Sequence, residues 1–188
     1  MDGLILFLHG FCSSPASWKA RLLGEAMAVR GLSAQFFCPS LSHEPDRVIH
    51  DLSQWIEAQA GAVTLVGSSL GGHYAACLAE KYGLSALLIN PAAVDCLDVG
   101  KFVGVHANYH TGETFQFTEA HAAQLKAQVV SPARGSYRLW LETGDAVLDY
   151  RDAQGFWFGC PQEVFEGGDH SFTRFPEMLP QLLEFAGL

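Results

Sequence analysis

A serine between two glycines is the residue pattern in this chain best suited to nucleophilic chemistry. The segment Gly67-Ser68-Ser69-Leu70-Gly71 has the form G-x-S-x-G and separates an apolar run from an expected helix. A serine hydroxyl at the tip of a strand requires a sharp turn, and glycines two residues on either side remove the Cβ atoms that would clash. The spacing selects Ser69, because Ser68 has Val66 where the first glycine would have to stand. A glycine-rich turn without catalysis is the alternative.

A nucleophilic serine needs a general base, and His170 is the histidine whose position fits this role. It lies in Gly167-Gly168-Asp169-His170-Ser171, between the last expected strand and the last expected helix. A loop at the carboxyl end of a parallel strand reaches the same sheet edge as Ser69, so the imidazole and the hydroxyl can meet there. The side chain of Asp169 is expected to point away from the imidazole.

The acid that would orient the imidazole is expected in a third loop at the same edge. Asp145 lies just past an expected strand at residues 137–142 and is preferred. Asp149 is the alternative, although it is better placed to cap the helix that follows. Asp95 and Asp98, after an earlier strand, are a more distant choice.

Two backbone N–H groups are expected to stabilise the negative charge that develops on a carbonyl oxygen during attack. One is the amide of Leu70, directly after the nucleophile, and the other is the amide of Phe11 in the turn Leu8-His9-Gly10-Phe11-Cys12. His9 is expected to brace this turn by hydrogen bonding. Cys12 has no evident histidine partner and is interpreted as a small buried hydrophobic residue.

Short apolar runs alternate with amphipathic ones, which predicts a parallel sheet covered by helices on both faces. Six strands are expected, at residues 4–8, 34–38, 62–66, 85–89, 137–142 and 163–165. Helices are expected at residues 17–30, 47–59, 70–82, 150–158 and 175–185. The predicted fold class is therefore α/β, with all 188 residues in a single domain.

Residues 91–133 break this rhythm and are too long for an ordinary connection, so we expect a lid-like insertion or a small helical excursion. The aromatic residues that are candidates to bind substrate are Phe11, Phe102, Tyr109 and Phe115, with Phe117 nearby. The alternative is that these rings only pack the insertion against the sheet.

Four residues of the insertion raise the question of a metal site: His106, His110, Glu113 and His121. Apart from the two histidines four positions apart, their spacing does not match that of metal ligands, so no metal is expected. The carboxylates of Asp145 and Asp149 are likewise interpreted as separate turn-forming acids rather than as a catalytic pair.

The composition excludes several classes of protein. A net charge of −9, from 11 basic and 20 acidic residues, argues against a nucleic acid or an anionic membrane as partner. No apolar run approaches the ~18 residues of a membrane span, and the first residues lack the positive charge of a signal peptide. Five scattered cysteines without a CxxC pair indicate reduced thiols. We therefore expect a globular cytoplasmic protein.

Taken together, the motifs resemble the α/β-hydrolase superfamily, and in particular the small bacterial esterases of the YqiA/YcfP group (UPF0227). The matching stretches follow one another through nearly the whole chain, at residues 8–15, 67–72, 90–92, 109–113, 143–151 and 167–172. Among these, Thr-Gly-Glu at 111–113 and Val-Leu-Asp-Tyr at 147–150 are the most particular to that group. Departures at His73 and His110 concern the shape of the pocket rather than the mechanism.

The resemblance implies a serine carboxylesterase without a cofactor, in which Ser69, Asp145 and His170 follow the superfamily's chain order. It also implies a sheet that begins at the strand that larger relatives use as their third. The expected substrate is a small-molecule ester, or a thioester such as acyl-CoA, cleaved through an acyl-enzyme. The alternatives are a thioesterase or acyltransferase with the same triad, disfavoured by the few basic residues, and a non-catalytic binding protein, disfavoured by the complete set of three residues.

Overall fold

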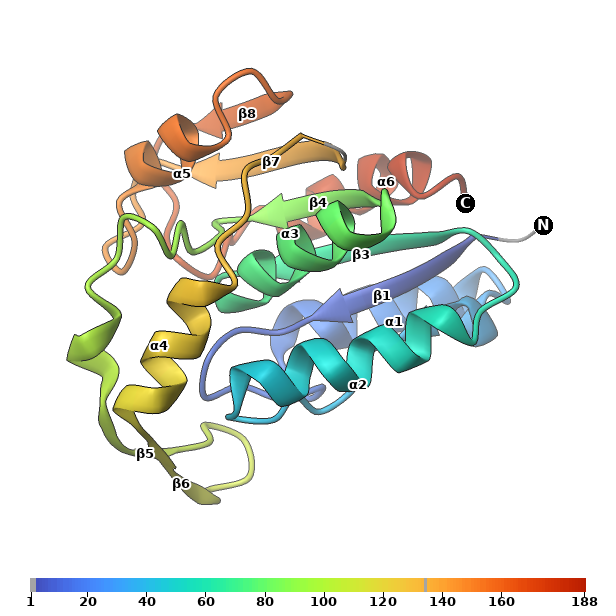
Figure 1. The fold of residues 1–188 in the computed structure, drawn as a ribbon. Coiled ribbons are helices and arrows are strands. Elements are labelled where there is room, and N and C mark those ends of the chain that lie inside the picture. The colour runs from blue at the N-terminus through green and yellow to red at the C-terminus, as the bar shows by residue number, and fades with distance from the viewer. Residues whose placement is uncertain (1–2, 134) are drawn as a thin grey trace.

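The computed structural model describes residues 3–133 and 135–188, and a six-stranded parallel sheet forms its centre (Figure 1). The strand order is β2-β1-β3-β4-β7-β8, and each neighbouring pair is parallel. The strands are β1 (Leu4–Leu8), β2 (Phe36–Phe37), β3 (Val63–Ser68), β4 (Ser85–Ile89), β7 (Ser136–Glu142) and β8 (Gln162–Phe165). The predicted α/β fold class is confirmed.

The central strands are apolar on both faces because helices cover both faces of the sheet. Leu6 and Leu8 of β1 face one apolar core, whereas Ile5 and Phe7 of the same strand face the other. Helices α2 (Pro45–Glu57), α3 (Leu70–Tyr82) and α5 (Tyr150–Phe156) cover the first face, and α1 (Trp18–Val29) and α6 (Phe175–Phe185) cover the second.

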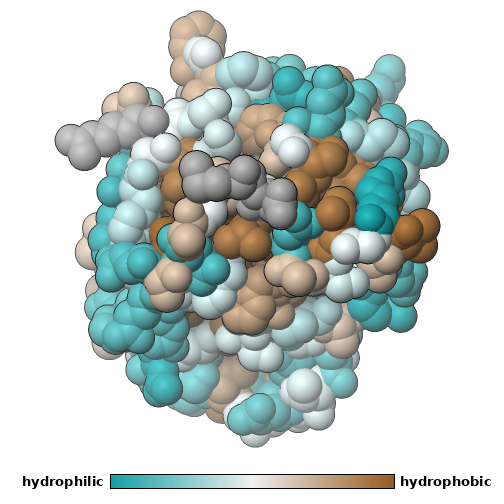
Figure 2. All heavy atoms as spheres, turned by 90° about the vertical axis from the view of Figure 1, so that its right-hand side faces the viewer, coloured by the Kyte–Doolittle hydropathy of each residue, from teal (hydrophilic) through white to brown (hydrophobic). Residues whose placement is uncertain are grey.

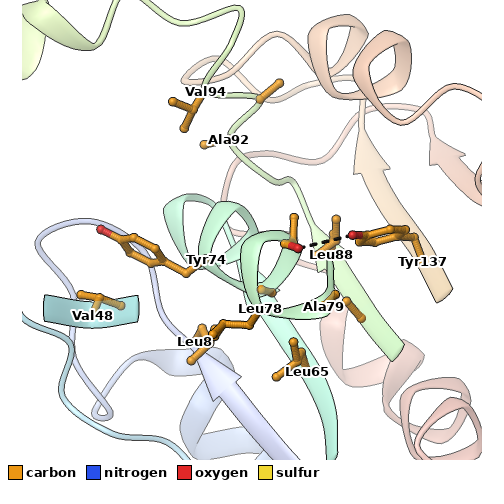
Figure 3. Close-up of a cluster of buried hydrophobic side chains, with 14 of the residues drawn as sticks. Leu8, Val48, Leu65, Tyr74, Leu78, Ala79, Leu88, Ala92, Val94 and Tyr137 are labelled. Atoms are coloured by element: carbon orange, nitrogen blue, oxygen red, sulfur yellow. Dashed lines mark hydrogen bonds between the residues drawn. The ribbon is translucent and has the colours of Figure 1, made fainter. Parts of the chain in front are cut away.

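Figure 3 shows the first of these cores, in which strand and helix side chains point toward one another. Leu65 of β3 and Leu88 of β4 belong to the same core as Leu78 of α3, and all three side chains are fully buried. Tyr137 of β7 reaches across to α3, where its hydroxyl donates to the carbonyl oxygen of Ala76 at 3.4 Å. This packing fixes α3, and with it the turn that precedes α3, against the sheet.

The connections after β1 and β3 leave the sheet toward opposite faces, although the two strands are neighbours. β1 leads to α1 on one face, and β3 leads directly to α3 on the other. Such a divergence opens a crevice beyond the carboxyl ends of the strands, where ligands bind in open α/β sheets.

Between β4 and β7 the chain forms a separate small unit on the side to which the strand arrows point in Figure 1. It contains a short 3-10 helix (Val99–Phe102), the antiparallel hairpin of β5 (Gly104–Ala107) and β6 (Thr114–Phe117), and α4 (Glu119–Ala127). The hairpin was not predicted, since each of its strands has four residues and polar side chains interrupt the apolar ones. The role of this segment as a lid remains a prediction.

The edge strand differs most from its prediction. The sequence indicated a strand at residues 34–38, but Ser33–Gln35 forms a 3-10 helix and only Phe36 and Phe37 pair with β1. This edge has a partner on one side only, so tertiary packing does not extend the strand as it does at the centre of the sheet. The other strands and helices begin and end within two residues of their expected bounds.

Figure 2 shows the opposite end of the molecule, where the strands begin and both termini lie. Hydrophobic side chains reach the surface there in patches between hydrophilic ones. Across residues 3–133 and 135–188, no helix combines the length and the apolar character that crossing a membrane requires.

Candidate active site

Ser69 occupies the turn between β3 and α3 in a backbone conformation that favours glycine, with φ 56° and ψ −123°. The flanking glycines make this turn possible. A Cβ atom on Gly67 would overlap the carbonyl group of Gly71, and a Cβ atom on Gly71 would overlap the carbonyl oxygen of Leu8. The turn therefore requires glycine at both positions, and it presents the Ser69 hydroxyl at the carboxyl edge of the sheet.

The three side chains selected from the sequence lie in one hydrogen-bonded row. The Oγ atom of Ser69 lies 3.0 Å from Nε2 of His170, and Nδ1 of His170 lies 2.7 Å from Oδ2 of Asp145. The Asp145 side chain is 2% exposed and the His170 side chain 26% exposed. A carboxylate in this position fixes the ring and favours the tautomer with the proton on Nδ1, which leaves Nε2 free to accept the serine proton.

The carboxyl group of Asp145 is held in its charged form. Burial raises its pKa, but hydrogen bonds from His170 and from two backbone amides outweigh burial, so the pKa lies below its usual value. The amides are those of Val147 and Leu148, which donate to Oδ1 at 2.8 and 2.9 Å. One carboxylate oxygen therefore faces the imidazole while the other is anchored to the turn.

The other acids considered in the sequence lie elsewhere. Asp149 caps α5, as expected, and its carboxylate pairs with the guanidinium of Arg151 at 2.7 Å. Asp98 pairs with Lys101 at 3.7 Å on the surface. Within the described residues, no hydrogen bond or ion pair joins Asp95 or Asp98 to the imidazole.

Two buried polar residues that the sequence analysis did not select hold the loop of His170. Asn90, at the end of β4, donates to the carbonyl oxygen of Asp169 at 3.0 Å and accepts from the amide of Glu142 at 2.9 Å. Glu142 is fully buried, accepts from the amide of Asp169 at 2.8 Å and pairs with Arg174 at 2.7 Å. These contacts join residues 27 to 79 positions apart, so no local sequence signal could have revealed them.

The backbone amides expected to bind an oxyanion border the same cavity as Ser69. Among the described residues, the amides of Phe11 and Leu70 donate to no other group of the protein. His9 braces the turn of Phe11: its Nδ1 bonds to the carbonyl oxygen of Gly10 at 3.0 Å, and its Nε2 accepts from the amide of Leu41 at 3.2 Å. Burial lowers the pKa of His9, so its ring is neutral at pH 7.

A cavity of about 370 Å³ opens at Ser69 and His170. Most of its lining side chains are apolar, and the segment between β4 and β7 supplies many of these, including Val94, Leu97 and Leu125. A smaller, polar part of the wall comes from the start of α1 and from the loop of His170; it consists of Ser17, Lys19 and Ser171.

The aromatic candidates divide between two cavities. Phe11, Phe102 and Tyr109 line the cavity of Ser69, and so does Phe117. Phe115 does not line that cavity but a second one of about 230 Å³, which Phe11 and Phe117 also border. It sits nearer the hairpin turn than Phe117, where its ring stacks on that of His43 at 5.1 Å. The edge-on contacts of Phe11 with Phe102, Phe115 and Phe117 show that these rings also pack the segment against the turn after β1.

The histidines of this segment do not converge on a common point. Nε2 of His106 lies 2.6 Å from the carbonyl oxygen of Phe102, and His121 forms a capping box with Thr118 at the start of α4. In the described part of the chain, no group of three or more His, Cys, Asp or Glu side chains is arranged to hold a metal ion. Cys12 is buried, and burial raises the pKa of its thiol, as expected of a packing residue.

A family model described as "Uncharacterised protein family (UPF0227)" matches residues 4–187. The chain belongs to UPF0227. The match extends from β1 to the end of α6, so every residue of the UPF0227 site described above lies inside it. The resemblance found in the sequence is thereby confirmed.

Solved structures similar to this UPF0227 protein share its fold at low sequence identity. α/β-Hydrolase domain-containing protein 10 from mouse has a TM-score of 0.69 and 17% identity, over 98% of this chain and 92% of that one. A metagenome-derived lipolytic enzyme of the LipS and LipT pair has a TM-score of 0.72 and 16% identity, over 99% and 95%. Est1E of Butyrivibrio proteoclasticus, bound to ferulic acid, has a TM-score of 0.67 and 12% identity, over 99% and 90%. The fold is therefore that of the α/β-hydrolases.

Proposed function

We propose that this UPF0227 protein is a serine hydrolase that cleaves carboxylic esters through an acyl-enzyme. The observation that carries the proposal is the row of hydrogen bonds from Asp145 through His170 to Ser69 at the edge of a cavity. The strained backbone of Ser69 supports it, because such strain gathers at functional sites. The backbone amides of Phe11 and Leu70 also support it, because among the described residues their N–H groups donate no hydrogen bond and are available to bind an oxyanion.

In the first half of the reaction, Oγ of Ser69 attacks the carbonyl carbon of the ester and its proton passes to Nε2 of His170. The carbonyl electron pair moves onto oxygen, and the amides of Phe11 and Leu70 bind the resulting oxyanion. When the tetrahedral intermediate collapses, the bond to the leaving alcohol breaks and Nε2 returns its proton to the leaving oxygen. Asp145 stabilises the imidazolium that forms between these two transfers.

In the second half, a water molecule replaces the alcohol. His170 removes one proton from the water, whose oxygen attacks the acyl carbon, and a second tetrahedral intermediate forms in the same oxyanion site. Its collapse releases the carboxylic acid, and Ser69 recovers its proton from Nε2. The cycle needs no further reactant.

The cavity favours a small substrate with an apolar acyl group. Its volume of about 370 Å³ lies near the lower end of the range of roughly 300–1,000 Å³ for small-molecule sites. Among the similar structures, the lipolytic enzyme and the ferulic-acid-bound Est1E are consistent with the proposal of an ester substrate. Thioesters remain within the proposed chemistry, because the acyl-enzyme step is the same for an oxygen or a sulfur leaving group.

The segment at residues 91–133 is proposed to act as a lid-like insertion in a single hydrolase domain. Its hairpin loop is tied to the turn after β1, where the amide of Tyr109 donates to the carbonyl oxygen of Cys12 at 2.8 Å. Nδ2 of Asn108 donates to the carbonyl oxygen of Ser13 at 2.7 Å. These two bonds link the segment, which supplies part of the apolar wall of the cavity, to the proposed oxyanion turn.

Labelling with a fluorophosphonate probe tests the proposal most directly, since the probe reacts with activated serines. The wild-type protein is expected to carry one phosphonyl adduct, located at Ser69 by mass spectrometry, and to hydrolyse 4-nitrophenyl butyrate. The Ser69→Ala variant should keep its fold by circular dichroism and lose both the label and the hydrolysis. Absence of labelling and hydrolysis in folded wild-type protein would contradict the proposal and favour a binding role.

A further inference from the structure

Lys19, in the first turn of α1, is a cation in the wall of the cavity that holds Ser69. Its ammonium group donates to the carbonyl oxygen of Ser171 at 2.7 Å, and Ser171 directly follows His170. Lys19 is partly buried by this position. The mechanism proposed above makes no use of it.

The ammonium group of Lys19 is only partly satisfied by the protein. It has three N–H donors, and one of them binds the carbonyl oxygen of Ser171. No carboxylate of the described residues forms an ion pair with it. Burial lowers its pKa to about 8 against the opposing effect of Asp169, Glu142 and Asp145, so the group is charged at pH 7. A cation left partly unpaired in a cavity is a binding point for an anion.

The position of Lys19 relative to His170 identifies the half of the substrate that it can reach. His170 must protonate the leaving oxygen, so the leaving group lies on the imidazole side of Ser69. The amides proposed to bind the oxyanion belong to other elements, namely the turn after β1 and the start of α3. Since Lys19 contacts the residue next to His170, it lies on the leaving-group side, whereas the apolar wall from residues 91–133 remains for the acyl group.

We propose that Lys19 binds an anionic group, such as a carboxylate, on the alcohol half of the ester. The inference rests on the proposed function and names its substrate class: esters of an apolar acid with an alcohol that itself carries a negative charge. Lys19 would then determine specificity through binding, because its ammonium group does not touch the atoms that react.

Two esters that differ only in charge test this inference. They are the butyrate esters of 3-hydroxybenzoate, which carries a carboxylate, and of 3-hydroxybenzamide, which is neutral. We expect Lys19→Gln to lower kcat/KM for the anionic ester by about tenfold, which corresponds to about 1.4 kcal/mol, chiefly through KM. The neutral ester should change by less than about twofold, and Lys19→Arg should retain the preference for the anionic ester. Comparing each variant with wild type on one ester cancels the esters' different intrinsic reactivities.

Arg21→Gln is the matched control, since Arg21 is exposed on the same helix and its loss changes the net charge equally. It should leave both rates unchanged. An equal loss on both esters in Lys19→Gln would overturn the inference and indicate that Lys19 only positions the loop of His170. No loss on the anionic ester would overturn it as well. If wild-type protein hydrolyses neither ester and Ser69 takes no phosphonyl label, the proposed function itself fails, which is a different result from either of these.

Discussion

At the scale of single residues, the environments of Asp145 and Asp149 assign different roles to two carboxylates four positions apart. Asp145 is buried against the imidazole, whereas Asp149 pairs with Arg151 on the surface. We expect Asp145→Asn to lower kcat for 4-nitrophenyl butyrate by about 10³- to 10⁴-fold, because an amide no longer stabilises the imidazolium or its tautomer. Asp149→Asn should stay within about fivefold of wild type, since exposed ion pairs contribute little.

Steady-state kinetics of the two variants, with circular dichroism to verify folding, make this comparison. A larger loss in Asp149→Asn than in Asp145→Asn would mean that the acid of the triad has been assigned to the wrong residue. Equal and small losses would mean that the row of hydrogen bonds does not serve catalysis.

The charge of Lys19 gives the proposed selectivity a pH dependence. The amine is protonated below its pKa of about 8 and neutral above it, so the preference for the anionic ester should be present at pH 7 and fall as the pH rises through 8. The groups that face it are the carboxylates of Asp145, Glu142 and Asp169, together with His170 on the same loop.

The measurement is the ratio of kcat/KM for the anionic and neutral esters between pH 6.5 and 9.5. Using the ratio cancels every pH effect that is common to the two esters. Lys19→Arg should give a flat ratio over this range, because the guanidinium remains charged. A wild-type ratio as flat as that of Lys19→Arg would contradict the prediction.

At the scale of secondary-structure elements, the loop between β8 and α6 depends on the ends of β4 and β7. Glu142 at the end of β7 is the central contact, because it binds both the amide of Asp169 and the guanidinium of Arg174. Glu142→Gln removes the charge but keeps the shape of the side chain. The single side-chain oxygen of glutamine can accept from the amide of Asp169 or from Arg174, so its NH₂ group faces the other donor and one of these contacts is lost. We expect a loss of about 3 kcal/mol in the free energy of unfolding, together with a lower kcat.

Urea denaturation and ester kinetics measure these two effects. Glu177→Gln, on the exposed first turn of α6, serves as control and should change the stability by less than about 0.5 kcal/mol. A Glu142→Gln variant as stable and active as the control would show that the loop does not need this contact.

The strands and helices that could be predicted from the sequence are those in which apolar residues follow one another, or recur at helical spacing, within a short segment. β1 and β4 are almost entirely apolar runs. The glycines around Ser69 predict the turn, because a Cβ atom on Gly67 would overlap Gly71 and a Cβ atom on Gly71 would overlap β1. The hairpin of β5 and β6 could not be predicted, since its strands are short and half exposed.

Of the site, Ser69, His170 and Asp145 could be selected because each follows the end of a strand. Lys19 could not be placed beside His170, because its contact with Ser171 spans 152 positions. Asn90 and Glu142 likewise acquire their role only when the ends of β4 and β7 meet the loop of His170.

At the scale of the whole molecule, the proposed active site joins the two helical layers. Ser69 leads into α3 on one face of the sheet, while the loop of His170 leads into α6 on the other. The contact of 3.0 Å between Ser69 and His170 therefore depends on how the two layers are aligned. A displacement of about 1 Å at a reacting group can reduce a rate by about 10²-fold.

Heating should therefore reduce hydrolysis before it unfolds the chain. We expect the initial rate for 4-nitrophenyl butyrate to fall below its Arrhenius extrapolation several degrees under the midpoint of unfolding that far-UV circular dichroism records. The helices are still formed at that temperature, but the layers are no longer held in one alignment. Coincidence of the two transitions would mean that the layers and the site are lost in a single step.

A practical consequence follows from the strained serine turn and its place between the layers. The hydrolytic rate should depend on how the helical layers on the two faces of the sheet are aligned. Substitutions in either layer should therefore change the rate even where the substituted residue does not contact substrate. Variants in α1, α3 or α6 could thus be ranked by how well they preserve the packing of the helices on the sheet, using the release of 4-nitrophenol at raised temperature as the assay. The reactivity of the Ser69 hydroxyl would then report the packing of both helical layers.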